Sequence, residues 1–267
     1  MGHYVGIDAG STFIKIAIIN NNILRGYKIA PSGIASRKTV KDLFNSLLNE
    51  LRMSRSDVVS IVSTGYGRRI IDIADETVTE IKAHAKGAMF TAPDGAKIRT
   101  IIDVGGQDCK VIILNEEREV KNFVMNDKCA AGTGRYIEVL ARTLETTIDK
   151  IGPLSLQAKT SCQINSLCTV FAESEVISLL ARGKNRADII AGIHKSLVKR
   201  ICVMAMRVGL EPEILLTGGG ALNSGLIAAF EDEIMMDIHI ARNPQFNGAI
   251  GAALIASNQN EEKNYSG

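Results

Sequence analysis

Two short turns with the pattern Asp-x-Gly contain residues that could bind phosphate and a metal ion. Asp8 and Gly10 recur as Asp103 and Gly105, so both pairs are separated by the same 95 residues. Each aspartate ends an apolar strand, where a carboxylate can hold a hydrated Mg²⁺, and each glycine lets the backbone approach phosphate oxygens closely. Gln107 follows the second turn and could orient an attacking water. The candidate catalytic residues are therefore Asp8, Asp103 and Gln107.

Residues around these turns complete a candidate nucleotide site. Hydroxyl and backbone N–H groups at the first turn can donate hydrogen bonds to phosphate, and a lysine on the next strand adds a positive charge. The segment LTGGGALN, residues 216–223, ends a strand and opens a helix, and its glycines permit an adenosine moiety to lie against the backbone. The candidate nucleotide-binding residues are Gly10, Ser11, Thr12, Lys15, Gly105, Gly106, Gly132, Gly134, Gly218, Gly219, Gly220, Ala221 and Gln245.

Cysteines form the second set of reactive residues. Cys129 and Cys168 each stand directly before a segment with a helical pattern, and a helix N-terminus stabilises a thiolate or an anionic cluster. An iron–sulfur cubane needs four thiolates, which a homodimer with the cluster on its two-fold axis would supply from two per chain. In a rival arrangement, Cys162 and Cys168 share one metal within the chain, with Cys129 and Cys202 as further ligands. Cys202 and Cys109 have the pattern of core residues, which disfavours that rival.

Composition and charge exclude several classes of protein. The 267 residues suffice for one large α/β domain or two lobes, and with 4% aromatic residues the cores must be aliphatic. A net charge of +2 and no basic tract argue against nucleic-acid binding. No apolar run reaches about 18 residues and no signal peptide is apparent, so we expect a cytoplasmic protein with no membrane partner. His3, His84, His194 and His239 lack ligand spacing and are expected to be structural or exposed.

The elements that must position these groups occur twice. Besides the Asp-x-Gly hairpins, IVSTGYG (61–67) matches ILLTGGG (214–220) at a spacing of 153 residues. Two matches in the same order predict two homologous α/β lobes, the second with an insertion of roughly 58 residues within about 116–213. We expect lobes at 1–97 and 98–244, with a C-terminal helix of about 245–258 packing on the first lobe and a frayed tail beyond it. Helices are predicted at 39–52, 133–146, 169–182, 186–208 and 248–257.

The duplicated hairpins and the triple-glycine turn resemble the superfamily of actin, heat-shock chaperones and sugar kinases. The resemblance implies an α/β fold of the duplicated actin-like, or ribonuclease H-like, ATPase type. It further implies that the two hairpins and the glycine turn bind ATP or ADP with Mg²⁺ in a cleft between two lobes.

Longer motifs resemble a narrower family. MNDKCAAGTGRYIEVLA, CTVFAESEV, DIIAGIHKSL and IDVGGQD are similar to the ATP-dependent activators of 2-hydroxyacyl-CoA dehydratases. The wider family includes the ATPase subunits of benzoyl-CoA reductase and the reductases of double-cubane cluster proteins. The resemblance implies a homodimer with one 4Fe–4S cluster, held by two ligands per subunit that match Cys129 and Cys168. It also implies that ferredoxin or flavodoxin donates the electron, which ATP drives at low potential to a dehydratase or related reductase.

Two other classes remain open at this point. A small-molecule kinase of the same fold would need an acceptor pocket and a general base, for which Asp108 is a candidate. A chaperone-like or structural ATPase would act by shape change and have no use for the cysteines.

Overall fold

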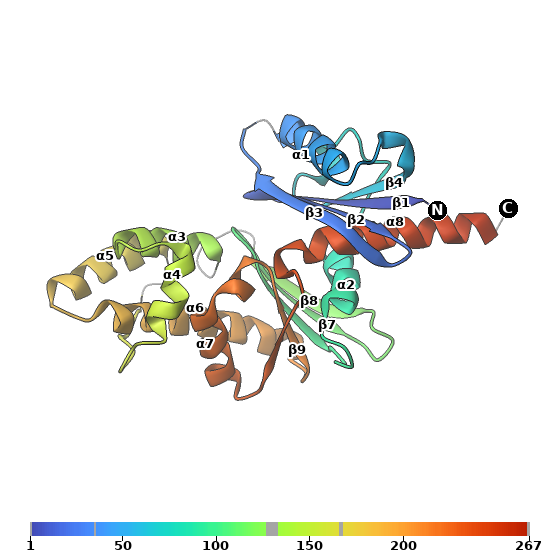
Figure 1. The fold of residues 1–267 in the computed structure, drawn as a ribbon. Coiled ribbons are helices and arrows are strands. Elements are labelled where there is room, and N and C mark those ends of the chain that lie inside the picture. The colour runs from blue at the N-terminus through green and yellow to red at the C-terminus, as the bar shows by residue number, and fades with distance from the viewer. Residues whose placement is uncertain (1, 35, 127–132, 166–167, 266–267) are drawn as a thin grey trace. The chain divides into compact units, whose positions relative to one another are not determined.

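The computed structural model describes residues 2–34, 36–126, 133–165 and 168–265 (Figure 1). The chain divides into two compact units, Met1–Ala92 with Gln245–Gly267 and Pro93–Pro244. We call these the first unit and the second unit. Each contains a five-stranded mixed sheet with helices packed on it.

The sheet of the first unit has the order β3-β2-β1-β4-β5. β1 and β2 form an antiparallel hairpin around the first Asp-x-Gly turn, and β4 lies parallel to β1. Helix α1 lies on one face of this sheet and α8 on the other (Figure 1). The elements are β1 (His3–Ala9), β2 (Phe13–Asn20), β3 (Ile23–Pro31), α1 (Ser36–Glu50), β4 (Val58–Thr64), β5 (Glu76–Thr77), α2 (Glu80–Thr91) and α8 (Asn247–Tyr265).

Branched aliphatic residues explain why this segment forms a sheet with two covered faces. β1 and β2 are buried along almost their whole length, with β-branched residues that favour the pleated backbone. Side chains on one face pack with Phe44 and Leu47 of α1, whereas Ala17 and Ile19 pack with Ala249 and Ile250 of α8. Alternate residues therefore serve two cores, and the hairpin register is fixed from both sides.

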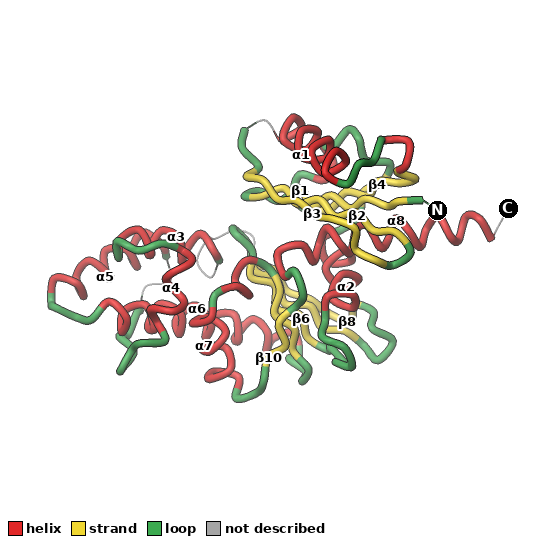
Figure 2. Tube along the Cα trace, viewed as in Figure 1, coloured by secondary structure: helices red, strands yellow, loops and turns green. Residues whose placement is uncertain are grey.

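The sheet of the second unit repeats this pattern with the order β10-β9-β6-β7-β8. β6 and β7 form the second antiparallel hairpin, and β9 lies parallel to β6. Figure 2 shows the strands of both sheets in yellow and the helices in red. The elements are β6 (Thr100–Val104), β7 (Cys109–Leu114), β8 (Val120–Asn126), α3 (Gly134–Thr143), α4 (Ile148–Ser155), α5 (Thr169–Ala181), α6 (Arg186–Val208), β9 (Ile214–Thr217), α7 (Ser224–Ile234) and β10 (Ile238–Ile240).

Helix α6 connects the sheet of the second unit with the inserted helices. It packs on β7 and β8, and it also contacts α4, α5 and α7. One continuous core runs from Ile102 and Val111 in the sheet through Leu140 of α3 to Ile193 and Val198 of α6. The insertion therefore shares its apolar core with the sheet and is not a separate appendage.

The structure confirms the helices predicted from sequence, with small differences at their ends. The helix expected at 39–52 spans Ser36–Glu50, and the one expected at 133–146 spans Gly134–Thr143. The helices expected at 169–182 and 186–208 span Thr169–Ala181 and Arg186–Val208.

The expectation of a frayed tail was wrong, because α8 continues to Tyr265. The sequence NQNEEK is polar, but Gln, Glu and Lys are good helix formers. Two side chains also anchor the extension to the first unit. Gln259 Nε2 donates to Glu76 Oε1 at 3.0 Å, and Asn260 Nδ2 donates to the Tyr4 hydroxyl at 2.9 Å.

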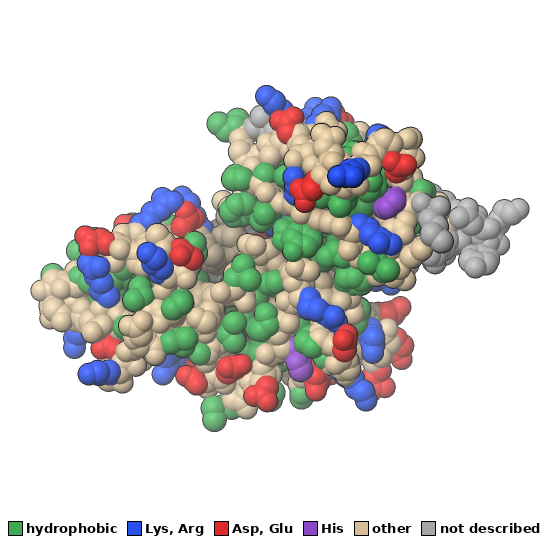
Figure 3. All heavy atoms as spheres, viewed as in Figure 1, with side chains coloured by type: hydrophobic (Ala, Val, Ile, Leu, Met, Phe, Trp, Pro, Cys, Tyr) green, Lys and Arg blue, Asp and Glu red, His purple; other side chains and the backbone are tan. Residues whose placement is uncertain are grey.

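The surface carries charges of both signs without a basic stripe on the face shown in Figure 3. Acidic and basic side chains both occur over the two units on that face, and the whole chain has a net charge of +2. Among the described helices, none has the length and apolar character required to cross a bilayer.

Candidate functional site

The two Asp-x-Gly turns have the same backbone geometry. Gly10 N–H donates to the Phe13 carbonyl at 3.1 Å, and Gly105 N–H donates to the Asp108 carbonyl at 3.0 Å. These residues occupy equivalent places at the 95-residue spacing, so the repeat seen in the sequence is also a repeat in hydrogen bonding. Each turn places its aspartate at the end of the parallel pair of strands, where Asp8 aligns with Thr64 and Asp103 with Thr217.

The first turn has a hydroxyl that lacks a partner. Thr12 Oγ1 is buried and makes no hydrogen bond, which among the described residues is true of no other buried side-chain oxygen or nitrogen. A buried polar atom without a partner costs about 1–3 kcal/mol. Ser11 beside it is exposed, and Ser32 Oγ donates to the Gly10 carbonyl at 2.6 Å, which fixes the turn. A phosphate oxygen accepting from Thr12 would satisfy this hydroxyl.

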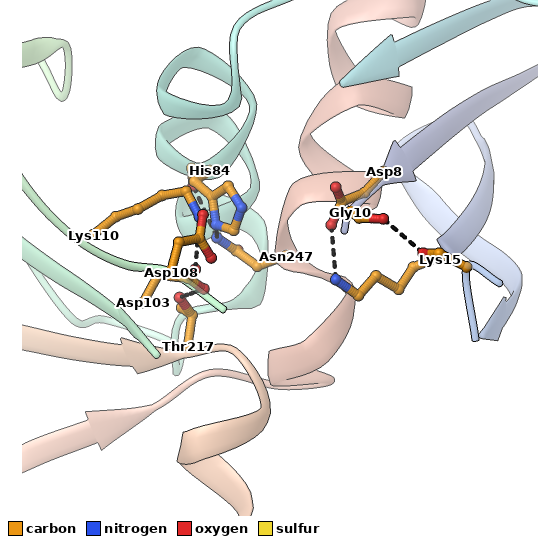
Figure 4. Close-up of polar contacts among 10 residues, drawn as sticks. Asp8, Gly10, Lys15, His84, Asp103, Asp108, Lys110, Thr217 and Asn247 are labelled. Atoms are coloured by element: carbon orange, nitrogen blue, oxygen red, sulfur yellow. Dashed lines mark hydrogen bonds and ion pairs between the residues drawn. The ribbon is translucent and has the colours of Figure 1, made fainter. Parts of the chain in front are cut away.

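Lys15 carries positive charge to the first turn. Its Nζ lies 3.1 Å from Asp8 Oδ2, and the two side chains are 20% and 8% exposed (Figure 4). Lys15 comes from β2 and Asp8 from the paired position on β1, so the hairpin register brings them together. The ammonium of Lys15 therefore stands beside the first turn at a position that solvent still reaches.

The second turn has a more enclosed arrangement. Lys110 is buried and its Nζ lies 3.4 Å from Asp103 Oδ2 and 2.5 Å from Asp108 Oδ2. Thr217 Oγ1 donates to the other oxygen of Asp103 at 2.7 Å. Asp103 is thereby held by a lysine from β7 and a hydroxyl from β9 (Figure 4). Gln107 lies exposed at the tip of the turn.

A buried histidine lies beside Asp8. Asn247 Nδ2 lies 3.3 Å from His84 Nδ1, and because an amide nitrogen can only donate, Nδ1 is the acceptor. The other nitrogen, Nε2, faces Gly248: a Cβ on this glycine would lie 3.0 Å from His84 Nε2 and 3.3 Å from Asp8 Oδ2. Gly248 at the start of α8 therefore lets an imidazole from α2 and a carboxylate from β1 converge.

The glycine turn of the second unit requires glycine at its first position. Gly218 has φ +80°, and a Cβ there would lie 2.4 Å from the Val104 carbonyl oxygen. Gly220 is buried against Val104 in the same way, whereas Gly219 is exposed. The turn opens a short 3-10 helix, Gly219–Leu222, that includes the buried Ala221. Gln245 of the first unit is half-buried in a second such helix, Pro244–Phe246.

Helix α3 begins on the second Asp-x-Gly turn. Gly134 N–H donates to the Gly105 carbonyl and Arg135 N–H to the Gly106 carbonyl, both at 2.8 Å. These amides belong to the first turn of a helix, which has no intrahelical partners for them. The Gly134 amide is thus engaged with the turn. Cys129 and Gly132 lie outside the described residues.

Cys168 stands at the start of a helix, as the sequence predicted. It is exposed and is the N-cap residue of the 13-residue helix α5. Val170, Phe171 and Ile177 on the same helix are also exposed, at 68%, 68% and 53%. Cys168 thus stands at the positive end of a helix that exposes several apolar side chains.

Two other described cysteines belong to the core, as expected. Burial raises the pKa of the Cys202 thiol to about 12, and burial together with the nearby Asp103 carboxylate raises the pKa of Cys109. Cys162 is half-buried, and its N–H donates to the Asp188 carbonyl at 2.9 Å. The described residues contain no cluster of three or more potential metal ligands.

Sequence reasoning missed the partners that hold the two aspartates. Thr217 was seen as part of a turn motif, and His84 was taken as structural or exposed without a link to Asp8. The strand alignment contained a signal for Thr217, because both Thr-Gly-x-Gly motifs place a threonine at the end of the strand next to an aspartate. No sequence signal relates His84 to Asp8, since α8 supplies the glycine that brings them together.

Two five-stranded sheets, each with an Asp-x-Gly hairpin of the same geometry, define an ATPase of the duplicated actin-like fold. Residues 5–256 match the model of the BadF/BadG/BcrA/BcrD ATPase family, and the chain belongs to this family. The family resemblance and the fold expected from the motifs are thereby confirmed.

Relatives cover the chain almost end to end. The activator of lactoyl-CoA dehydratase from Anaerotignum propionicum is 43% identical over 97% of this chain and 99% of its own. Among solved structures, the activator of 2-hydroxyisocaproyl-CoA dehydratase from Clostridium difficile with bound ADPNP matches with a TM-score of 0.92 and 38% identity, over 99% of this chain and 98% of that one. Component A of (R)-2-hydroxyglutaryl-CoA dehydratase from Acidaminococcus fermentans matches with a TM-score of 0.91 and 39% identity, over 97% and 99%.

Proposed function

We propose that this protein is an ATP-hydrolysing activator that delivers a low-potential electron to a 2-hydroxyacyl-CoA dehydratase. Its donor would be ferredoxin or flavodoxin, and it would act as a homodimer with one 4Fe–4S cluster. The observation that carries the proposal is the pair of equivalent Asp-x-Gly turns on a chain similar over nearly its full length to dehydratase activators, one of which has a solved structure with bound ADPNP.

Each unit offers groups suited to a nucleotide. The unpaired hydroxyl of Thr12 and the ammonium of Lys15 are suited to phosphate oxygens, because one lacks a hydrogen-bond acceptor and the other supplies charge. The turn at Gly218–Gly220 offers a surface without side chains for the adenosine. Asp8 of the first unit and Asp103 of the second unit are each a candidate to hold the hydrated Mg²⁺ that accompanies ATP.

Hydrolysis needs an oriented water and neutralised phosphate charge. Gln107 is exposed at the tip of the second turn and is the candidate to orient that water. Water adds to the terminal phosphorus, the bond to the ADP oxygen breaks, and the proton of the water leaves with the phosphate product or solvent. Lys110 and Thr217 keep Asp103 in place while this occurs.

The cluster would be held by Cys129 and Cys168 of each subunit, and it would supply one-electron transfer. The described ligand fits this role because Cys168 is exposed at a helix N-terminus, which favours an anionic group. The exposed Val170, Phe171 and Ile177 on the same helix offer apolar side chains for contact with the second subunit. Nucleotide binding would act on Cys129 through α3, whose first amides hydrogen bond to Gly105 and Gly106.

Observations at the second turn disfavour a kinase. Asp108 would have to serve as the general base for an acceptor hydroxyl, but its carboxylate pairs with Lys110 at 2.5 Å. The ammonium of Lys110 occupies that carboxylate oxygen, so an acceptor hydroxyl would have to compete with the lysine for it.

The decisive test combines metal analysis with two kinds of cysteine variant. Anaerobically purified wild type is expected to contain about four iron and four acid-labile sulfide atoms per dimer, with a broad visible band lost in air. Cys129→Ala and Cys168→Ala are each expected to lose the iron while keeping ADPNP binding. Cys202→Ala, a substitution in the core, is the control that should keep both. A full iron complement in either ligand variant would refute the shared-cluster assignment.

Activity tests the remaining part of the proposal. With ATP and a strong reductant, the wild type should activate a 2-hydroxyacyl-CoA dehydratase, whereas ADPNP, which is not hydrolysed, should not support repeated turnover. Phosphorylation of a small molecule without need for iron would favour the kinase alternative.

A further inference from the structure

A buried polar network joins three helices of the second unit. His194 of α6 is 1% exposed. Its Nδ1 lies 3.1 Å from Ser155 Oγ at the end of α4, and its Nε2 lies 3.1 Å from Asn223 Nδ2, the residue that caps α7. The motif DIIAGIHKSL that contains this histidine has no role in the nucleotide or cluster sites described above.

The direction of every hydrogen bond in the network follows from its chemistry. Asn223 Nδ2 can only donate, so His194 Nε2 accepts and the ring proton is on Nδ1. Nδ1–H then donates to Ser155 Oγ, and that hydroxyl donates to the Gly152 carbonyl at 2.8 Å. Burial lowers the pKa of His194 to about 4, so the ring is neutral at pH 7, as one donated and one accepted bond require.

The atoms around the network are closely packed. A Cβ on Gly225 would lie 1.8 Å from Ser155 Oγ and 2.9 Å from His194 Nδ1. A Cβ on Gly152 would lie 2.6 Å from Asn223 Oδ1. The three helices therefore meet through atoms in contact, and a displacement at one member must be transmitted or must break a hydrogen bond.

One end of the network is the glycine turn proposed to bind the nucleotide. Asn223 N–H donates to the Gly220 carbonyl at 3.1 Å, and Ala221 N–H donates to the Gly218 carbonyl at 3.2 Å. The side chain of Asn223 also accepts from Leu226 N–H at 3.1 Å. A shift of the turn thus reaches His194 through a single residue.

The other end is the segment that leads to Cys168. Near the start of α6, Asp188 accepts the Cys162 N–H through its carbonyl at 2.9 Å. Its carboxylate accepts the N–H groups of Lys159 and Thr160 at 2.9 and 3.1 Å. One turn further along, a Cβ on Gly192 would lie 2.0 Å from the Cys162 carbonyl oxygen. The segment 159–162 is therefore fixed to the helix that carries His194.

We propose that His194 is a positioning residue that couples the nucleotide-binding glycine turn to the segment preceding Cys168. This inference rests on the proposed function, because it assigns the turn to the nucleotide and Cys168 to the cluster. Asn223 transmits the position of the turn to His194, and α6 transmits it to residues 159–162. A nucleotide on the turn would then tighten the segment next to one ligand cysteine.

Hydrogen exchange of the backbone tests this coupling in the intact protein. In wild type, saturating ADPNP with Mg²⁺ is expected to slow exchange of the Lys159, Thr160 and Cys162 amides about fivefold or more. His194→Leu should abolish this slowing at saturating nucleotide. His239→Leu, the same substitution at a partly exposed site of the second unit, should retain it.

A second variant tests the coupling in case His194→Leu does not fold. Ser155→Ala removes the acceptor of Nδ1–H and leaves the contact between His194 and Asn223, so it should weaken the slowing while the chain remains folded. Undiminished slowing in either variant, or no slowing in a wild type that binds ADPNP, would overturn the coupling alone. A wild type that fails to bind ADPNP would instead overturn the proposed function.

Discussion

Lys15 and Lys110 occupy equivalent positions in the two hairpins but have different surroundings. Each lies on the second strand of its hairpin, at the residue paired with an aspartate. The side chain of Lys15 is 20% exposed and pairs with Asp8, whereas that of Lys110 is 4% exposed and bridges Asp103 and Asp108. The duplicated position has therefore become a phosphate-facing candidate in one hairpin and an internal ion pair in the other.

Substituting each lysine by methionine separates these roles. Lys110→Met leaves Asp103 without its buried cation and is expected to lower the free energy of unfolding by about 3–5 kcal/mol. Lys15→Met is expected to change stability by less than about 1 kcal/mol and to weaken ADPNP binding about tenfold or more, because a charge-assisted hydrogen bond to phosphate is lost. Chemical denaturation and calorimetric titration of both variants measure the difference. Equal loss of stability in the two would contradict it.

His194 also makes stability depend on pH. The pKa of His194 is about 4 in the folded protein against 6.5 for an ordinary histidine, so between these values the unfolded chain binds the extra proton. Stability is therefore complete above about pH 6.5 and falls as the pH is lowered toward 4, by about 3 kcal/mol in total from this group. His194→Gln should flatten the dependence of unfolding free energy on pH across that window. An unchanged slope would show that the histidine titrates normally.

At the level of elements, α8 packs unusually closely on its neighbours. A Cβ on Gly251 would lie 1.8 Å from the Ala83 carbonyl oxygen of α2. A Cβ on Gly87 of α2 would lie 2.0 Å from the Asn247 carbonyl oxygen, and one on Gly6 of β1 would lie 1.9 Å from the Ala249 carbonyl oxygen. The first unit therefore depends on backbone-to-backbone contact at several glycines, which any side chain would disrupt.

Gly251→Ala should expose this dependence. The added methyl meets a backbone carbonyl that cannot move without shifting a helix, so we expect a loss of about 3 kcal/mol or more despite the better helix propensity of alanine. Gln259→Ala, on the same helix but held by a side-chain contact at the surface, should cost less than about 1 kcal/mol. Thermal unfolding of both variants compares them, and a Gly251→Ala protein as stable as wild type would refute the tight contact.

The sequence predicted elements better than it predicted their contacts. Apolar alternation and the Asp-x-Gly turns were sufficient for both hairpins, because strand pairing across a short turn is local. The third strands β3 and β8 were missed, since apolar and polar residues do not alternate regularly in the sequences ILRGYKIAP and VKNFVMN. The continuation of α8 beyond Asn258 was also missed, because Gln259 and Asn260 gain their partners from Glu76 and Tyr4, far away in the sequence.

The features of the site that depend on local sequence could be predicted, whereas those that depend on distant contacts could not. Asp8, Gly10 and their repeats were recognisable because the turn itself is the signal. The unpaired hydroxyl of Thr12 and the convergence of His84 on Asp8 required the packed structure, since burial and the approach of α8 produce them.

Across the whole molecule, the duplication extends to individual atoms. A Cβ on Gly65 would lie 2.6 Å from Asp8 Oδ1 and 2.7 Å from the Ala9 carbonyl oxygen. The equivalent Gly218 has the corresponding neighbours, Asp103 Oδ1 at 3.0 Å and the Val104 carbonyl oxygen at 2.4 Å. Both glycines have positive φ, +90° and +80°. The two units have therefore kept the same contact between the glycine turn and the aspartate strand, although the second acquired the inserted helices.

The second unit is one continuous segment of the chain, whereas the first unit consists of two segments. The isolated fragments are therefore expected to behave differently. Residues 93–244 form the second unit from one continuous segment with its own sheet and core, so this fragment is expected to fold alone and unfold cooperatively. The first unit needs α8: without 245–267, Ala17, Ile19 and Val62 lose the face against which they pack. Residues 1–92 should therefore remain unfolded or aggregate, and fusing 245–267 behind them through a flexible linker should restore a folded unit. Circular dichroism and thermal unfolding of the three fragments test this, and a stable fold for 1–92 alone would contradict the structural role assigned to α8.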